Sequence, residues 1–194
     1  MDFVLLAAGG LAALMFLLRR LPGVVTTSSP APSSPAPQPA NLPAPPPSLA
    51  WSPAELAVLV GEIAAEESYG RPALAKAIIT VESSWNPGAI GVADSVPRNA
   101  YDPGDSIGLM QLKIATARAY VPWANGALEL LDAPTNIRAG IRFLADLERK
   151  WLGTYGLDGV IQMYNLGETR FRQGERTAGY LEKVRRALRA YGVS

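Results

Sequence analysis

A single glutamate, Glu82, has the sequence context of an acid catalyst. It closes an apolar run, residues 74–81, and a helix-stopping Trp-Asn-Pro-Gly segment comes next at residues 85–88. On a helix it would lie at the edge of a buried stripe formed by Leu74, Ile78, Val81 and Trp85. Burial disfavours a charged carboxylate and raises its pKa, so the group could keep a proton near neutral pH and donate it to a leaving group. Taken alone, the position is more typical of a helix-end carboxylate hydrogen-bonded to a neighbour.

The composition narrows the chemistry further. The chain has 194 residues, no cysteine and no histidine. It therefore lacks the thiolate and imidazole groups of the common metal sites and nucleophilic triads, and we expect neither a metal nor another cofactor. Carboxylate, tyrosine and lysine side chains remain for acid–base work, which increases the weight given to Glu82. A formal net charge of +1 gives no electrostatic reason to expect a nucleic-acid partner.

Two further segments carry side chains that could contact a sugar. Residues 106–111 read Ser-Ile-Gly-Leu-Met-Gln, and residues 163–167 read Met-Tyr-Asn-Leu-Gly. The first places a thioether and an amide beside a glycine that permits close backbone approach. By local signals alone, the first is more typical of a turn entering a helix, and the second of a helix end terminated by glycine. Neither segment indicates a function by itself.

The elements expected to position these residues are mainly helical. Ser52-Pro53-Ala54-Glu55 combines a capping box with proline at the first helical position. Hydrophobic periodicity and end signals predict helices from that cap to about residue 68, from residue 72 through Glu82, and over residues 135–151, 157–165 and 177–191. Glycine, proline and aspartate break residues 90–107 into turns, where only a small hairpin would fit. We expect a mainly α domain with one long irregular loop or small hairpin.

The first 50 residues differ from the rest of the chain. Residues 3–18 form an uncharged apolar run that predicts a membrane anchor over residues 1–21, if Arg19 and Arg20 reach the interface. A cleaved signal peptide fits less well, and a helix buried in a protein assembly is the alternative. The two arginines favour a cytoplasmic location for the rest of the chain, which conflicts with a cell-wall substrate. Residues 22–50 are rich in proline, alanine and serine and predict an extended linker to a domain at residues 51–194.

Four segments in order resemble the soluble-lytic-transglycosylase family of lysozyme-like enzymes. They are Glu-Ser-Ser-Trp-Asn-Pro at 82–87, Gly-Leu-Met-Gln at 108–111, Tyr-Asn at 164–165 and Tyr-Leu-Glu-Lys-Val at 180–184. The resemblance covers residues 72–188, and the segment Asn-Ile-Arg-Ala-Gly-Ile-Arg-Phe-Leu at 136–144 also looks like a helix of that family. It implies an α+β lysozyme-like fold that is mostly helical, with peptidoglycan strands as the substrate.

The resemblance implies cleavage of the β-1,4 bond between N-acetylmuramic acid and N-acetylglucosamine without water as the nucleophile. Glu82 would protonate the bridging oxygen and then take the proton of the sugar's C6 hydroxyl, leaving a 1,6-anhydromuramoyl end. One carboxyl group would suffice, whereas most glycosidases need two. Tyr180 would hydrogen-bond Glu82 or the intermediate, although it could simply belong to the core. The remaining residues would bind sugar groups or shape the groove: Ser106, Gly108, Met110, Gln111, Tyr164 and Asn165.

Some features leave alternatives open. The segment between Glu82 and Gly108 is longer than in the shorter family members, and it carries Asp94, Asp102 and Asp105. Goose-type lysozymes have an aspartate in a comparable loop, so Asp102 could activate water and make the enzyme a muramidase, although turn chemistry is the more typical reading of this segment. A non-catalytic peptidoglycan-binding component is a third hypothesis. Glu62, Glu66 and Glu67 are expected to form a solvated helix face.

The expected setting is a membrane-anchored protein of a phage virion or of the bacterial cell envelope, at its periplasmic face. A short anchor, a long spacer and a small wall-cutting domain suit a particle or a secretion apparatus that opens the wall locally. Partners would then be peptidoglycan, a membrane, and virion or secretion-system proteins.

Overall fold

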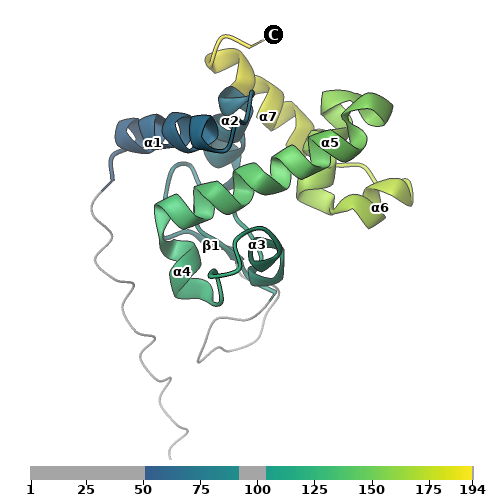
Figure 1. The fold of residues 1–194 in the computed structure, drawn as a ribbon. Helices are drawn as coiled ribbons and strands as arrows, with labels where there is room; N and C mark the ends of the chain where they lie inside the picture. Colours follow the sequence, from purple (N-terminus) through teal and green to yellow (C-terminus); the bar gives the residue numbers. More distant parts are fainter. Residues whose placement is uncertain (1–50, 92–103, 194) are drawn as a thin grey trace, which may run out of the picture. The chain divides into compact units, whose positions relative to one another are not determined.

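The structure, a computed structural model, describes residues 51–91 and 104–193 (Figure 1). The predicted anchor, the linker and two loop aspartates, Asp94 and Asp102, lie outside the described residues. Among the residues that are described, no helix is both long and apolar enough to cross a membrane. The described part is mainly helical, as predicted.

The helix α1, Pro53–Glu66, begins as the sequence predicts. The Ser52 side chain accepts a hydrogen bond from the Glu55 backbone N–H at 3.3 Å, and the Glu55 carboxylate accepts one from the Ser52 backbone N–H at 2.7 Å. This reciprocal capping box satisfies amide groups that the first helical turn leaves unpaired.

The helix α2, Pro72–Glu82, ends at the candidate catalytic residue. Leu74 and Ile78 are buried as predicted, but the last member of the expected stripe, Trp85, is not helical. Ser84 and Trp85 both adopt left-handed backbone conformations, with φ values of 51° and 67°, which end the helical path. The Trp85 indole N–H donates to Thr80 Oγ1 at 3.1 Å, so the ring folds back on the helix.

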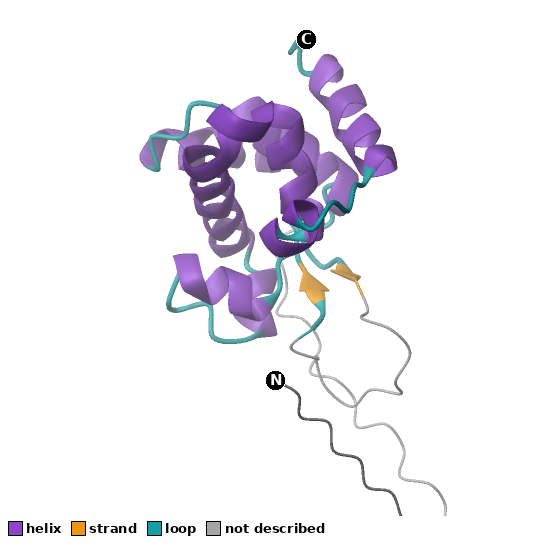
Figure 2. Ribbon diagram, turned by 90° about the vertical axis from the view of Figure 1, so that its right-hand side faces the viewer, coloured by secondary structure: helices purple, strands orange, loops and turns teal. Residues whose placement is uncertain are grey.

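A small hairpin comes next, as the sequence predicts. The strands β1, Ile90–Gly91, and β2, Ser106–Ile107, pair in antiparallel register, with Ile90 opposite Ile107 and Gly91 opposite Ser106. Figure 2 shows the two strands together at one edge of the helices. Immediately after β2, a turn over residues 108–111 brings Leu112 back to pair with Ile107.

Five helices complete the described chain. They are α3, Ile114–Tyr120; α4, Ala127–Leu131; α5, Ala133–Leu166; α6, Glu168–Arg172; and α7, Ala178–Ala190. Gly156 interrupts α5 with a φ of 64° and a ψ of −178°, and the two parts of α5 correspond to the predicted helices at 135–151 and 157–165. The sequence did not predict α4 or α6, each of which has 5 residues.

The helix α5 is the centre of the packing. It contacts α1, α2, α3, α4, α6 and α7, and Figure 1 shows it crossing between α1, α2 and α7 on one side and α3 and α4 on the other. Its buried face carries fully buried Ile137, Ile141, Leu144 and Leu147. Separately, α2 packs against α7, which brings the end of the second helix close to the last one.

The prediction that Glu62, Glu66 and Glu67 form a solvated helix face was wrong in part. The Glu67 carboxylate, whose side chain is 15% exposed, accepts hydrogen bonds from Arg138 at 2.5 Å and from Arg142 at 2.7 Å. The hydrogen bond from Arg142, the largest influence, holds the pKa of Glu67 below its usual value. Glu66 also pairs with Arg138, at 2.6 Å, while Glu62 is exposed as expected. The ion pairs of Glu66 and Glu67 therefore link the C-terminal end of α1 to α5.

Candidate active site

Glu82 and Tyr180 form a hydrogen-bonded pair at the contact between α2 and α7. Glu82 is the last residue of α2, and Tyr180 lies in the first turn of α7. The Tyr180 hydroxyl donates to Glu82 Oε1 at 2.6 Å, the contact that the sequence resemblance implied. Burial raises the pKa of the Glu82 carboxyl group, while the bond from Tyr180 acts in the opposite direction. The net shift is upward, so Glu82 holds its proton at a higher pH than a solvated glutamate does.

Tyr164, on the last turns of α5, connects this pair to the Gly-Leu-Met-Gln turn. Its hydroxyl donates to the Met110 carbonyl oxygen at 2.7 Å, and its ring packs 5.2 Å from that of Phe143. Burial, and then the nearby charge of Glu82, raise the pKa of Tyr164 well above its usual value. The same two influences, in the same order, raise the pKa of Tyr180. Both tyrosines are therefore neutral hydrogen-bond donors within electrostatic reach of Glu82.

Asn136, fully buried on α5, holds the turn in place. Its Oδ1 accepts the Met110 backbone N–H at 2.8 Å, and its Nδ2 donates to the carbonyl oxygens of Ile107 at 2.8 Å and Leu130 at 2.9 Å. Sequence reasoning gave this side chain no role. Asn136 could have been recognised from its position, a single amide beside the apolar stripe of α5. A buried amide needs several hydrogen-bond partners, so it usually holds other groups in place.

Gly108 is required by both conformation and space. Its φ is 77°, and a Cβ atom there would lie 2.3 Å from Asn136 Nδ2 and 2.5 Å from the Leu130 carbonyl oxygen. The residue is buried and does not line the pocket beside Tyr164. This glycine lets the backbone pass close to Asn136, and its contact with substrate stays a prediction.

The Met110 side chain is fully buried and does not line the pocket, so any part it has in shaping a groove, which stays a prediction, is indirect. The thioether instead occupies the space above Gly140, where a Cβ atom would lie 2.1 Å from Met110 Sδ. Met110 acts through its backbone, which accepts from Tyr164 and donates to Asn136.

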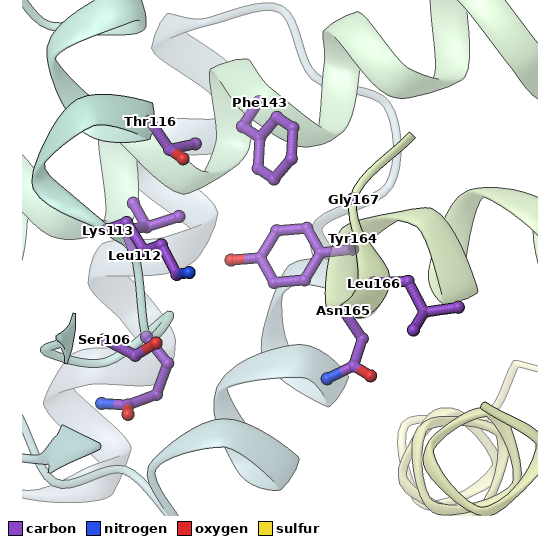
Figure 3. Close-up of a pocket in the computed structure, with 10 residues that line it drawn as sticks. Ser106, Leu112, Lys113, Thr116, Phe143, Tyr164, Asn165, Leu166 and Gly167 are labelled. Atoms are coloured by element: carbon purple, nitrogen blue, oxygen red, sulfur yellow. The ribbon is translucent and has the colours of Figure 1, made fainter. Parts of the chain in front are cut away.

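The pocket itself, of about 210 Å³, lies between β2, α3 and the end of the second part of α5 (Figure 3). Four predicted site residues line it: Ser106, Gln111, Tyr164 and Asn165. The Gln111 amide nitrogen already donates to the carbonyl oxygens of Ala89 at 3.1 Å and Gly108 at 2.9 Å, which ties the turn to the hairpin. Asn165 is exposed, and Ser106 is half-buried. These positions supply hydroxyl and amide groups of the kind that bind sugars.

Six lining residues were missed by the sequence reasoning: Leu112, Lys113, Thr116, Phe143, Leu166 and Gly167. Leu112, Lys113 and Thr116 come directly after the Gly-Leu-Met-Gln segment, and Leu166 and Gly167 come after Tyr-Asn. Their proximity to the two motifs was the signal that could have found them. Phe143 belongs to the segment 136–144 that resembles a helix of the family, but nothing in that segment indicated that its side chain reaches the pocket.

Among the described residues, no carboxylate lines this pocket, and Glu82 itself is not part of its lining. Asp105 is 1% exposed, and it does not line the pocket. Asp102, the predicted challenger, lies outside the described residues. Within residues 51–91 and 104–193, no cluster of three or more acidic side chains is arranged to hold a metal ion.

Comparison with known proteins assigns the family. The model of the transglycosylase SLT domain matches residues 61–186, more than half of the chain. The chain therefore belongs to this family, whose members are lytic transglycosylases that act on peptidoglycan. No curated protein and no solved structure matches the chain.

Proposed function

We propose that this protein is a lytic transglycosylase that cleaves the β-1,4 bond between N-acetylmuramic acid and N-acetylglucosamine in peptidoglycan, with Glu82 as both acid and base. The observation that carries the proposal is the half-buried Glu82 carboxyl group, whose Oε1 atom lies 2.6 Å from the Tyr180 hydroxyl and whose pKa is raised by burial. A carboxyl group in such surroundings can be protonated at the start of a reaction and then be stabilised as an anion.

The reaction proceeds in two proton transfers. Because Tyr180 donates to Oε1, the Oε2 atom of Glu82 is the one that carries the acidic proton. That proton moves to the bridging oxygen as the bond from the muramoyl C1 breaks. The Tyr180 hydrogen bond then stabilises the new carboxylate, as hydrogen bonds to charged groups do. The carboxylate takes the proton of the C6 hydroxyl while the C6 oxygen bonds to C1, which restores the acid and closes the 1,6-anhydro ring.

This mechanism needs no water and no second carboxylate. Among the described residues, the only hydrogen-bond partner of the Glu82 carboxyl group is the Tyr180 hydroxyl, not a second carboxyl group. An inverting or retaining hydrolase would need a partner carboxyl group at a defined distance from Glu82. Hydrolysis with Asp102 activating a water molecule is the alternative, and the chemistry of the released fragments distinguishes the two.

The test uses purified sacculi and mass spectrometry of the released fragments. The full chain should release muropeptides with 1,6-anhydromuramoyl ends, whereas reducing muramic ends would support the muramidase alternative. Replacing Glu82→Gln should lower the rate by a factor on the order of 10³ or more, since one group performs both transfers. Glu62→Gln, which alters an exposed residue of α1, is the matched control and should leave the rate unchanged. Absence of any cleavage by the unmodified chain would indicate a non-catalytic peptidoglycan-binding role.

We also propose that the enzyme is tethered to a membrane and opens the wall locally for a phage particle or an envelope-spanning assembly. The support is the apolar run at residues 3–18, followed by the proline-rich residues 22–50. Detection of the protein in purified virions, or in the membrane fraction of a producing cell, would separate the two settings. If the protein is absent from purified virions and is recovered only in the soluble fraction of the producing cell, the proposed membrane tether is contradicted.

A further inference from the structure

The pocket beside Tyr164 contains one charged side chain, Lys113. The other nine lining residues are neutral at pH 7, so the pocket carries a formal charge of +1 from the described residues. Figure 3 shows the Lys113 side chain extending into the pocket, on the side opposite Asn165 and Leu166. A mixed apolar and polar pocket with a single cation favours a ligand that is mostly neutral and bears one negative group.

Nothing in the local structure accounts for a cation at this position. Lys113 is the N-cap residue of α3, and its side chain makes no capping hydrogen bond. A positive charge at a helix N-terminus opposes the helix dipole, so the residue does not stabilise α3. No acidic residue lies in the first turn of α3, and among the described residues the Lys113 ammonium has no ion-pair or hydrogen-bond partner. Lys113 is exposed to solvent and lines the pocket.

We propose that Lys113 binds a carboxylate carried by the muramoyl residue of the substrate, and that it thereby selects muramoyl glycans over neutral ones. This inference rests on the proposed function. The two sugars of peptidoglycan are neutral apart from the lactyl group on the muramoyl O3, which ends either in a free carboxylate or in a peptide that bears carboxylates. The muramoyl ring is also the ring whose C1 reacts, so its O3 substituent lies within one sugar of Glu82.

The packing of the helices brings the pocket and Glu82 near each other. Tyr164, which lines the pocket with Lys113, lies on α5, and α5 contacts both α2 and α7, the helices that carry Glu82 and Tyr180. We therefore expect a muramoyl ring bound with C1 near Glu82 to have its lactyl side toward this pocket. Ser106, Thr116 and Asn165 supply neutral polar groups there, which suit hydroxyl and acetamido groups rather than a carboxylate.

Binding should be measured without turnover, so that the result does not depend on catalysis. The full-length Glu82→Gln chain is titrated with three soluble glycans of equal length: muramoyl strands with intact peptides, muramoyl strands stripped to the free lactyl carboxylate, and N-acetylglucosamine oligomers. The same titrations are repeated with Lys113→Gln, Lys113→Arg and Arg186→Gln added to the Glu82→Gln chain. Arg186 is exposed on α7, so its replacement controls for the loss of one positive charge elsewhere.

Lys113→Gln should weaken binding by about three- to tenfold for at least one muramoyl glycan, the range expected for a hydrogen bond between charged groups at a solvent-open site. An effect confined to the stripped strands identifies the lactyl carboxylate, and an effect confined to the intact strands identifies the peptide. Lys113→Arg should retain affinity, and raising the salt concentration should reduce the difference. Binding to N-acetylglucosamine oligomers should not change.

Equal affinities of the Lys113→Gln and parent chains for both muramoyl glycans would overturn the inference. So would an equal loss with N-acetylglucosamine oligomers, or the same loss in Arg186→Gln. The proposed function is tested separately by the release of anhydromuropeptides from the unmodified chain. The role of Lys113 and the proposed catalytic function can therefore be contradicted independently of each other.

Discussion

At the scale of single residues, the central feature is a carboxyl group subject to two opposing influences. Burial favours the neutral acid of Glu82, and the Tyr180 hydroxyl favours the carboxylate. A group that must serve as acid and then as base benefits from both, because neither form is stabilised to the exclusion of the other.

Tyr180→Phe should separate the two influences. Loss of the hydrogen bond should raise the pKa of Glu82 further and move the basic limb of the pH profile of kcat/KM to higher pH. The maximum rate should fall by about ten- to a hundredfold, because the carboxylate formed in the reaction loses a charge-assisted hydrogen bond. A pH–rate profile on sacculi measures both, with Tyr155→Phe, an exposed ring, as the control. A lower rate with an unshifted limb would show that Tyr180 does not act on Glu82.

The raised pKa of Glu82 also predicts a pH dependence of stability. In the folded state the group binds a proton more tightly than at its usual pKa of 4.5. Stability from the neutral form is therefore fully present below about pH 4.5 and is lost as the pH rises through the folded-state pKa. Glu82→Gln cannot ionise, so its free energy of unfolding relative to the unmodified chain should increase as the pH rises above 4.5 and should level off once the pH exceeds the folded-state pKa of Glu82. Urea denaturation of both chains measures the difference. A constant difference across this range would contradict the shift.

The sequence could predict the residues that meet at the site but not all of their tasks. Tyr180 hydrogen-bonds Glu82, and Tyr164 hydrogen-bonds the Gly-Leu-Met-Gln turn, because the ordered motifs indicate which elements must converge. Met110 was assigned to the groove because a motif does not reveal which side of a turn faces the core. Asn136 was overlooked for the complementary reason, since its three partners are backbone groups that only the folded chain brings together.

At the scale of elements, the contact between α5 and the Gly-Leu-Met-Gln turn fixes the site. Gly140 on α5 leaves the space that Met110 fills, and Asn136 binds the backbone of the same turn one helical turn earlier. The turn and the helix therefore fit each other at two successive positions. A substitution in the turn or in α5 should therefore force the other to shift, because packed interiors contain little spare volume.

Gly140→Ala should test this fit. The added Cβ would overlap the Met110 thioether, so the variant should lose about 1–3 kcal/mol of unfolding free energy. Gly153→Ala is a matched control on the same helix, where a Cβ atom would meet nothing within 4 Å. It should gain about 0.5–1 kcal/mol, the usual difference between glycine and alanine inside a helix. Urea denaturation at one pH measures both; equal shifts in the two variants would mean that Met110 does not occupy the space above Gly140.

The predicted helix ends agree with the structure where the local sequence signals were strong. The capping box of α1, the proline that opens α2 and the glycine that ends α5 at residue 167 were all readable. The short helices α4 and α6 were not, because five residues contain too little periodicity to distinguish a helix from a turn. The role of Glu67 was also hidden, since its partners Arg138 and Arg142 come from a distant part of the sequence.

At the scale of the whole molecule, the described core is built entirely from residues 51–193. Its buried side chains run from Leu56 to Leu188, and α5 contacts every other helix of the described residues. A core of this kind should fold without the N-terminal residues. The functions predicted for those residues, anchoring and spacing, would then be separate from cleavage.

A chain shortened to residues 51–194 should therefore unfold cooperatively and cleave isolated sacculi at the rate of the full chain. Thermal denaturation and muropeptide release measure the two properties. If the first 50 residues only tether the domain, deleting them should change where the enzyme acts and not how fast it cuts a soluble substrate. Loss of folding or of cleavage in the shortened chain would show that the N-terminal residues are part of the domain.

The pairing of Glu82 with Tyr180 also sets an order of events during synthesis. The two side chains are 98 residues apart in the chain, and the helix that carries Tyr180 is the last one described. While the ribosome is still making the chain, Glu82 exists without its hydrogen-bond partner, and the end of α2 lacks the helix that packs on it. The Glu82–Tyr180 pair, the proposed catalytic pair, therefore forms only after α7 has been made, so a chain that stops before residue 178 holds Glu82 without its hydrogen-bond partner.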